Sequence, residues 1–157
     1  MQFEGSVKLR APREEVWKFV TDPVVVGRCI PGLESLEPIK DGREYRVVVK
    51  AQVGPTAPTF DLSLVYTLVM PPSEARLRIR GKGGAGSHIG ASSYMVLREL
   101  SEKETEMQWS FVVAMTGQLA TVANRFVEPV FQRLSKQFLA AVDEHLSNPR
   151  NGLRVAV

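Results

Sequence analysis

Hydrophobic and polar residues alternate near the start of the chain and again through most of its middle. Phe3, Val7 and Leu9 are separated by charged or polar residues, which is the period of a half-buried strand. The same period recurs in residues 45–53, 60–70, 76–82, 91–100 and 105–115. Successive strands at hairpin spacing predict an antiparallel meander with one apolar face and one solvated face.

Two short helices are predicted directly after the first strand. Pro12 suits the first turn of a helix over residues 12–20, because its missing N–H costs nothing at that position. Asp22 followed by Pro23 combines a helix cap with a first-turn proline, which predicts a second helix over residues 22–28.

Past Gly117 the hydrophobic period becomes that of a helix of about 28 residues ending near Asn148. Pro129 lies inside this segment and predicts a kink. Ser135 is predicted on the polar side. The apolar stripe is predicted to contain Leu119, Ala123, Phe126, Val127, Val130, Leu134, Phe138 and Ala141.

The predicted order is one strand, two short helices, six strands, five of which show the alternating period, and one long helix. This order predicts an α+β fold in which a curved antiparallel sheet wraps round the long C-terminal helix. A chain of 157 residues is expected to form one domain. We expect that domain to cover residues 1–148, with a flexible tail at 149–157.

The inward strand faces and the helix stripe are predicted to enclose an apolar ligand cavity, since one sheet curved round one helix rarely fills its whole interior. The alternative is a solidly packed core. Tyr45, Tyr66 and Trp109 could supply polar groups to a ligand. The predicted cavity residues are Tyr45, Val47, Phe60, Leu62, Leu64, Tyr66, Leu77, Ile79, Met95, Trp109, Phe111, Met115, Ala123, Phe126, Val130 and Leu134.

A glycine-rich stretch between two predicted strands contains a formal GxGxxG match. A dinucleotide site needs this motif between a strand and a helix, so we reject that interpretation. A flexible or bulged hairpin is the simpler interpretation, because glycines weaken pleating. The functional alternative is a mobile lip over the mouth of the cavity, formed by Gly81, Gly83, Gly84 and Gly86.

The sequence contains no arrangement of residues that predicts a catalytic or metal site. His88 and His145 are far apart and have no metal-ligand partner at helical or turn spacing. Cys29 has no base nearby in sequence and is interpreted as a small buried hydrophobic residue. We therefore expect no catalytic residue, no metal and no cofactor.

The charge pattern excludes one class of partner and leaves another open. The 20 Lys and Arg exceed the 17 Asp and Glu by too little, and are too dispersed, to predict nucleic-acid binding. An alternating row of Arg76, Arg78, Arg80 and Lys82 is predicted on the outer face of the sheet. Such a row is either solvated or a docking patch for an acidic partner or an anionic lipid.

The sequence predicts a cytoplasmic protein. No apolar run approaches the roughly 18–20 residues that cross a bilayer, and the first residues do not form a signal peptide. The lone Cys29 permits no internal disulfide, as is usual in a reducing compartment.

Several short motifs occur in an order that resembles a known family. They cover about residues 1–146 and resemble the CoxG family of carbon monoxide dehydrogenase, within the START-like (SRPBCC) helix-grip superfamily. The motifs are Val16-Trp17, Thr21-Asp22-Pro23, Cys29-Ile30-Pro31-Gly32, Val53-Gly54-Pro55, the glycine-rich residues 81–86, Gly117-Gln118-Leu119 and Gln137-Phe138.

The resemblance implies a seven-stranded sheet gripping the C-terminal helix round an apolar tunnel. It implies a non-catalytic accessory protein that binds a lipid or isoprenoid quinone. The implied partner is a molybdenum hydroxylase-type enzyme, a molybdenum-containing carbon monoxide dehydrogenase, which the protein would recruit to the membrane or supply with quinone. Peripheral contact with the inner face of the cell membrane is part of that expectation. Two alternatives stay open: a START-like cyclase or hydrolase, and a docking scaffold without a ligand.

Overall fold

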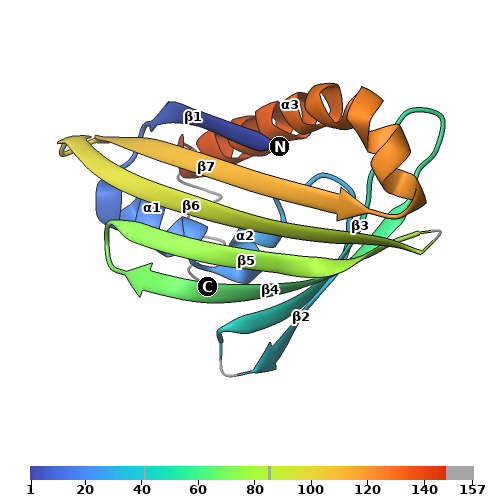
Figure 1. Cartoon of the computed structure of the whole chain (residues 1–157). Helices are drawn as coiled ribbons and strands as arrows, with labels where there is room; N and C mark the ends of the chain where they lie inside the picture. The colour runs from blue at the N-terminus through green and yellow to red at the C-terminus, as the bar shows by residue number, and fades with distance from the viewer. Residues whose placement is uncertain (41, 85, 148–157) are drawn as a thin grey trace.

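The structure is a computed structural model that describes residues 1–40, 42–84 and 86–147. One antiparallel sheet has the strand order β1-β7-β6-β5-β4-β3-β2, and the helices lie on one side of it (Figure 1). The predicted α+β architecture with seven strands is confirmed, and the tail predicted at 149–157 lies outside the described residues. The strands are β1 (Gln2–Leu9), β2 (Leu33–Lys40), β3 (Glu44–Lys50), β4 (Thr59–Met70), β5 (Glu74–Gly83), β6 (Ser87–Ser101) and β7 (Glu104–Thr116).

The two short helices form where the sequence predicts them. Helix α1 covers Arg13–Val20 and helix α2 covers Pro23–Gly27. The Asp22 carboxylate accepts hydrogen bonds from the backbone N–H groups of Val24, at 3.1 Å, and of Val25, at 3.4 Å. This carboxylate therefore caps α2 as predicted.

Strands β2 and β4 depart from simple alternation within their length. The register of β2 shifts between Leu33 and Ser35 and again between Pro38 and Lys40, so its residues show no clean period of two. In β4 the register shifts after Tyr66, which places Met70 opposite Glu74 on the outer face. The single period of two predicted over residues 60–70 therefore fails beyond Tyr66, because one extra residue in a strand reverses every side chain beyond it.

Helix α3 covers Gln118–Ser147 and contains Pro129. It changes direction between its first turns and the remainder (Figure 1), as a proline inside a helix predicts. Beyond the proline, the side that faces the sheet includes Phe131, Ser135 and Phe138, and it continues to the fully buried Val142. The prediction that Ser135 lies on the polar side is wrong.

The two ends of α3 are attached to the sheet in different ways. At the start, the backbone N–H of Leu119 donates to the hydroxyl of Ser87 on β6, at 2.8 Å. Towards the C-terminal end, Val142 lies in a solid core with Leu9, Val16 and Leu97, all of which are at most 2% exposed. The middle of the helix therefore spans the sheet between two fixed points.

Trp109 lies on the inward face of β7 opposite Gly5 of β1. A Cβ atom added to Gly5 would lie 2.8 Å from Cζ2 of this indole. The missing side chain of Gly5 therefore makes room for the indole.

Replacing Gly5 with alanine tests this packing. Gly5→Ala is expected to lower the free energy of unfolding by about 1–3 kcal/mol, the usual effect of overpacking. Gly90→Ala is the matched control, because a Cβ atom on this β6 glycine meets no heavy atom within 4 Å. Urea denaturation measures both changes, and equal stability of the two variants would contradict the packing described.

Candidate ligand-binding cavity

Two adjoining cavities lie between α3 and the sheet. The first chamber has a volume of about 200 Å³ and the second chamber about 390 Å³. Together they fall within the roughly 300–1,000 Å³ of ordinary small-molecule sites. Phe111, Phe131, Ser135 and Phe138 contribute to the walls of both chambers, so these side chains form the boundary between them.

The first chamber is bounded by the two short helices, by the sheet and by the second half of α3. Val20 and Val26 close it from the side of the short helices. Besides the four boundary residues, the other wall residues are Tyr66, Ala75, Leu77, Ser93, Met95, Met107, Trp109 and Leu139.

The second chamber lies under the first half of α3 and the segment that joins β3 to β4. Ala51 and Val53 of that segment lie in its wall, and the Arg133 guanidinium donates to the Gln52 carbonyl at 3.1 Å, which connects the segment to α3. The remaining wall residues outside the boundary are Ile30, Pro31, Val49, Phe60, Leu62, Ile89, Val113, Met115, Leu119, Val130 and Leu134. All of them are apolar.

Aromatic stacking holds the boundary in place. The ring of Phe131 stacks on Phe3, with centroids 4.0 Å apart, and on Phe111, with centroids 5.2 Å apart. Trp109 lies beside Phe131 at a centroid distance of 6.0 Å. Phe131 is thus fixed between strands β1 and β7, and helix and sheet touch here through a few large rings.

Tyr66 is the one ionisable side chain among the described residues that line the two chambers. Burial raises its pKa to about 12, and the nearby Tyr45 and Asp22 act in the same direction. Its hydroxyl is therefore neutral and able to donate a hydrogen bond at physiological pH.

Most of the predicted cavity residues lie in a chamber wall. Tyr45, Val47, Leu64 and Ile79 do not, although Tyr45 and Val47 are buried. Alternation assigns a residue to a face of the sheet but does not show how far the helix reaches across that face. The side chains of Ala123 and Phe126 lie outside the described residues. The predicted residues found in the walls are Phe60, Leu62, Tyr66, Leu77, Met95, Trp109, Phe111, Met115, Val130 and Leu134.

Two of the three predicted polar anchors, Tyr45 and Trp109, do not present their polar group to a ligand. The Tyr45 hydroxyl donates to the carbonyl of Gly42 at 2.8 Å. The Trp109 indole nitrogen is buried and has no hydrogen-bond partner among the described residues. The reachable polar groups of the first chamber are instead the hydroxyls of Tyr66, Ser93 and Ser135.

Phe131 and Ser135 are the most important cavity residues that the sequence does not predict. The signal that could have found them is the spacing of Phe131, Ser135, Phe138 and Val142, which follows i, i+4, i+7 and i+11. The predicted stripe began before Pro129, and a proline kink changes which side of the later turns faces inward.

The predicted glycine lip is a hairpin beside the second chamber. Gly81 and Gly83 pair within β5 and β6, while the turn contains Gly84 and a left-handed Gly86 with a φ of 70°. A Cβ atom on Gly83 would lie 2.6 Å from the ring of Phe60, a wall residue of the second chamber. Movement of this hairpin stays a prediction.

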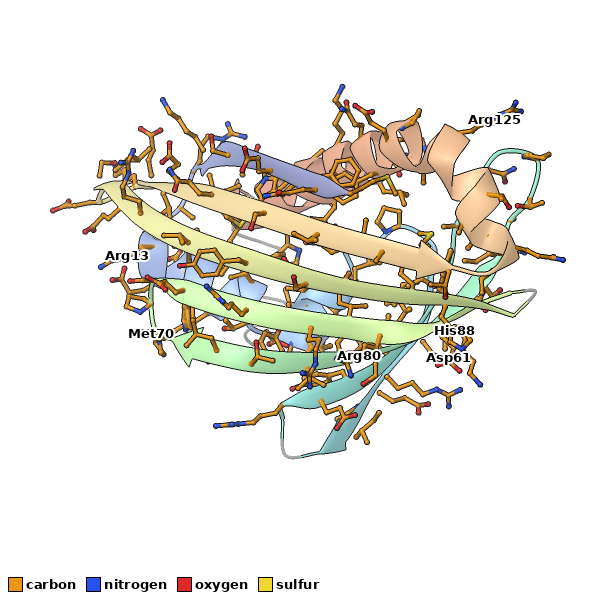
Figure 2. All side chains as sticks on the ribbon, in the orientation of Figure 1. Arg13, Asp61, Met70, Arg80, His88 and Arg125 are labelled. Carbon is orange, nitrogen blue, oxygen red and sulfur yellow. The ribbon has the colours of Figure 1, made fainter. Side chains whose placement is uncertain are left out.

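The remaining candidate groups lie away from the chambers. Burial raises the pKa of the Cys29 thiol, which makes it a poor nucleophile, and burial together with Arg28 lowers the pKa of His145. Arg80 and His88 lie on the outer face of the sheet (Figure 2). Within residues 1–40, 42–84 and 86–147, no group of three or more His, Cys, Asp or Glu side chains could hold a metal ion. In the same part of the chain, no helix has the length and apolar character needed to span a bilayer.

Three solved structures share the fold across nearly the whole chain. A conserved protein from Geobacillus kaustophilus has 23% identity and a TM-score of 0.85, over 94% of this chain and 95% of that one. The ZhuI aromatase/cyclase from Streptomyces sp. R1128 has 19% identity and a TM-score of 0.70, over 96% and 97%. Norcoclaurine synthase from Thalictrum flavum has 11% identity and a TM-score of 0.63, over 92% and 84%. These similarities confirm the helix-grip fold.

Sequence comparison identifies a family. The family model of the CoxG subunit of carbon monoxide dehydrogenase matches residues 5–147. No curated protein matches the chain.

The environment of Tyr66 predicts a pH-dependent stability. The folded chain holds the Tyr66 proton up to about pH 12, whereas the ordinary value is 10.0. The neutral Tyr66 hydroxyl therefore contributes fully to the free energy of unfolding below about pH 10. This contribution is lost as the pH rises through about 12. Urea denaturation from pH 9 to pH 12, of the natural chain and of Tyr66→Phe, measures it. The natural chain is expected to lose more stability over this range than the variant, and parallel curves would contradict the assigned burial.

Proposed function

Because the chain belongs to the CoxG family of carbon monoxide dehydrogenase, we propose that it is an accessory protein that binds an apolar ligand without transforming it. The observation that carries this proposal is the composition of the two chambers. Their described walls are almost wholly apolar, with Tyr66 as the one ionisable side chain. Such a site provides affinity chiefly through burial of apolar surface.

The size of the chambers supports a ligand rather than an empty interior. The chambers measure about 200 and 390 Å³, and leaving them empty would forfeit the packing contacts of their mostly apolar walls. A hydrocarbon chain that fills them gains about 0.8 kcal/mol for each CH₂ group buried. A lipid or an isoprenoid quinone has the necessary long apolar portion.

The proposed absence of catalysis follows from the same walls. General acid–base catalysis needs a group whose pKa lies near the operating pH. Tyr66 has a pKa of about 12, and the other described wall residues carry no carboxylate, imidazole, amine or guanidinium. The cyclase and synthase that share the fold are the reason to test turnover directly.

The proposed partner is a molybdenum-containing carbon monoxide dehydrogenase or a related molybdenum hydroxylase. The family name implies association with such an enzyme. In this role the protein would deliver quinone or recruit the enzyme to the cytoplasmic face of the membrane.

Analysis of the purified protein tests the proposal. Native mass spectrometry and solvent extraction, applied to protein from its natural host, should show a neutral lipid or quinone bound in stoichiometric amount. A ligand-free protein that also fails to bind added prenylated naphthoquinone would overturn the proposal. Conversion of a bound compound to a new product would favour the enzyme alternative.

Two neighbouring valines offer a matched test of the second chamber. Val113 is 4% exposed and lies in the chamber wall, whereas Val112 is 45% exposed on the opposite face of β7. Val113→Phe fills part of the chamber and is expected to weaken binding of a prenylated naphthoquinone about tenfold, or about 1.4 kcal/mol. Val112→Phe should leave binding unchanged. Titration calorimetry measures both, with thermal denaturation as a check on folding, and equal affinities would count against ligand binding in this chamber.

A further inference from the structure

The two chambers differ in the hydrogen-bonding groups that they offer. From this difference we infer that the ligand is an uncharged amphiphile, with a polar ring in the first chamber and an aliphatic tail in the second. The ligand would pass Phe131 at the boundary. This orientation rests on the proposed function and deepens it, because it specifies which chemistry the cavity selects.

The first chamber contains three hydroxyls without a partner. No hydrogen bond is formed by the side-chain oxygens of Tyr66, Ser93 or Ser135 within the described part of the chain, and none of these atoms is sealed from contact. A hydroxyl in an apolar site is stabilised by an acceptor, because leaving it unpaired costs free energy. The first chamber therefore favours a head group with carbonyl or ether oxygens.

The second chamber offers no comparable group. Ser135, at the boundary, is the one polar side chain among its described wall residues. A head group placed at the far end, beside Val53 or Met115, would lose its hydrogen bonds to water and gain none. The polar end of the ligand is therefore favoured in the first chamber and the tail in the second.

The walls also select against charge. The described wall residues include no Lys, Arg or His that could pair with a carboxylate or phosphate. An ionised group buried without a partner costs several kcal/mol. Tyr66 keeps its proton up to about pH 12, so it donates a hydrogen bond to a neutral acceptor. Fatty acids and phospholipids are thus disfavoured relative to neutral lipids that carry a carbonyl group.

The chamber volumes fit the two parts of such a ligand. A cavity of about 150 Å³ holds a benzene molecule, so the first chamber, at about 200 Å³, suits one ring or two small fused rings. Phe111 and Phe131 offer aromatic faces at the boundary, against which a planar ring can stack. The second chamber, at about 390 Å³, takes a longer flexible chain.

Paired variants in the full-length, delipidated chain test the orientation. The probes are a 1,4-naphthoquinone carrying a prenyl chain, squalene as a hydrocarbon without carbonyl groups, and palmitate at about pH 8, where its carboxylate is ionised. Tyr66→Phe combined with Ser93→Ala removes two donors from the first chamber. Tyr94→Phe combined with Ser92→Ala removes the same groups from the outer face of β6 and serves as the control.

The donor-deleted variant is expected to bind the prenylated naphthoquinone about tenfold more weakly, while its affinity for squalene stays unchanged. The control should bind both probes like the natural chain. Palmitate should bind the natural chain about 100-fold more weakly than the quinone. Equal loss for quinone and squalene, no loss at all, or tight palmitate binding would overturn the inference and leave the proposed function standing. Failure of all three probes to bind the natural chain would instead overturn the proposed function.

Tryptophan fluorescence tests whether the ring enters the cavity near Trp109. Trp17 and Trp109 are the two tryptophans, and Trp109 alone lines a chamber wall. In Trp17→Phe, a naphthoquinone ring bound in the cavity should quench most of the Trp109 emission by energy transfer, whereas squalene should not, and loss of affinity in the donor-deleted variant then assigns the ring to the first chamber. Saturable quinone binding with emission unchanged would place the ring elsewhere and overturn the inference.

Discussion

The structure depends on how α3 is held over the sheet. At its start the helix is tied to β6 through the hydrogen bond between Leu119 and Ser87, and towards its end Val142 is locked into the core formed with α1 and β6. Between these points the stacked rings of Phe3, Phe131 and Phe111 act as spacers. The middle of the helix is therefore supported without closing on the sheet, and the two chambers are the space that results.

This support leaves the most buried packing at one end of the helix and the chambers beside it. The tightest packing lies around Leu9, Val16 and Leu97, at the end where α1 meets the sheet. Ala75 and Met107 belong to this core and also line the first chamber, so the core and the cavity share a wall. The almost wholly apolar walls, with Tyr66 neutral, then favour binding over chemistry. The same fold supports cyclases and synthases elsewhere, and function depends on what lines the interior.

Much of the fold could be predicted from the sequence, because alternation and the helical stripe are direct consequences of one buried face. The predictions failed where one residue changes the period. Register shifts in β2 and after Tyr66 in β4 reverse the faces of the strands, and Pro129 changes which side of α3 is buried, which left Phe131 and Ser135 unassigned. Tyr45 and Val47 face inward as predicted but lie outside both chambers, since the depth of a cavity depends on contacts between distant segments. The accessory role and the class of ligand were predicted from the family motifs, since the hydrophobic period carries no information about either.

The central claim is that open, mostly apolar space lies on both sides of Phe131. Xenon occupies apolar cavities that hold no water, so a crystal structure of the delipidated protein under xenon pressure tests the claim most directly. We predict xenon in both chambers, with the Phe131 ring between the two sites. Ordered water filling the apolar second chamber, or side chains that fill either chamber when the ligand is removed, would contradict the account.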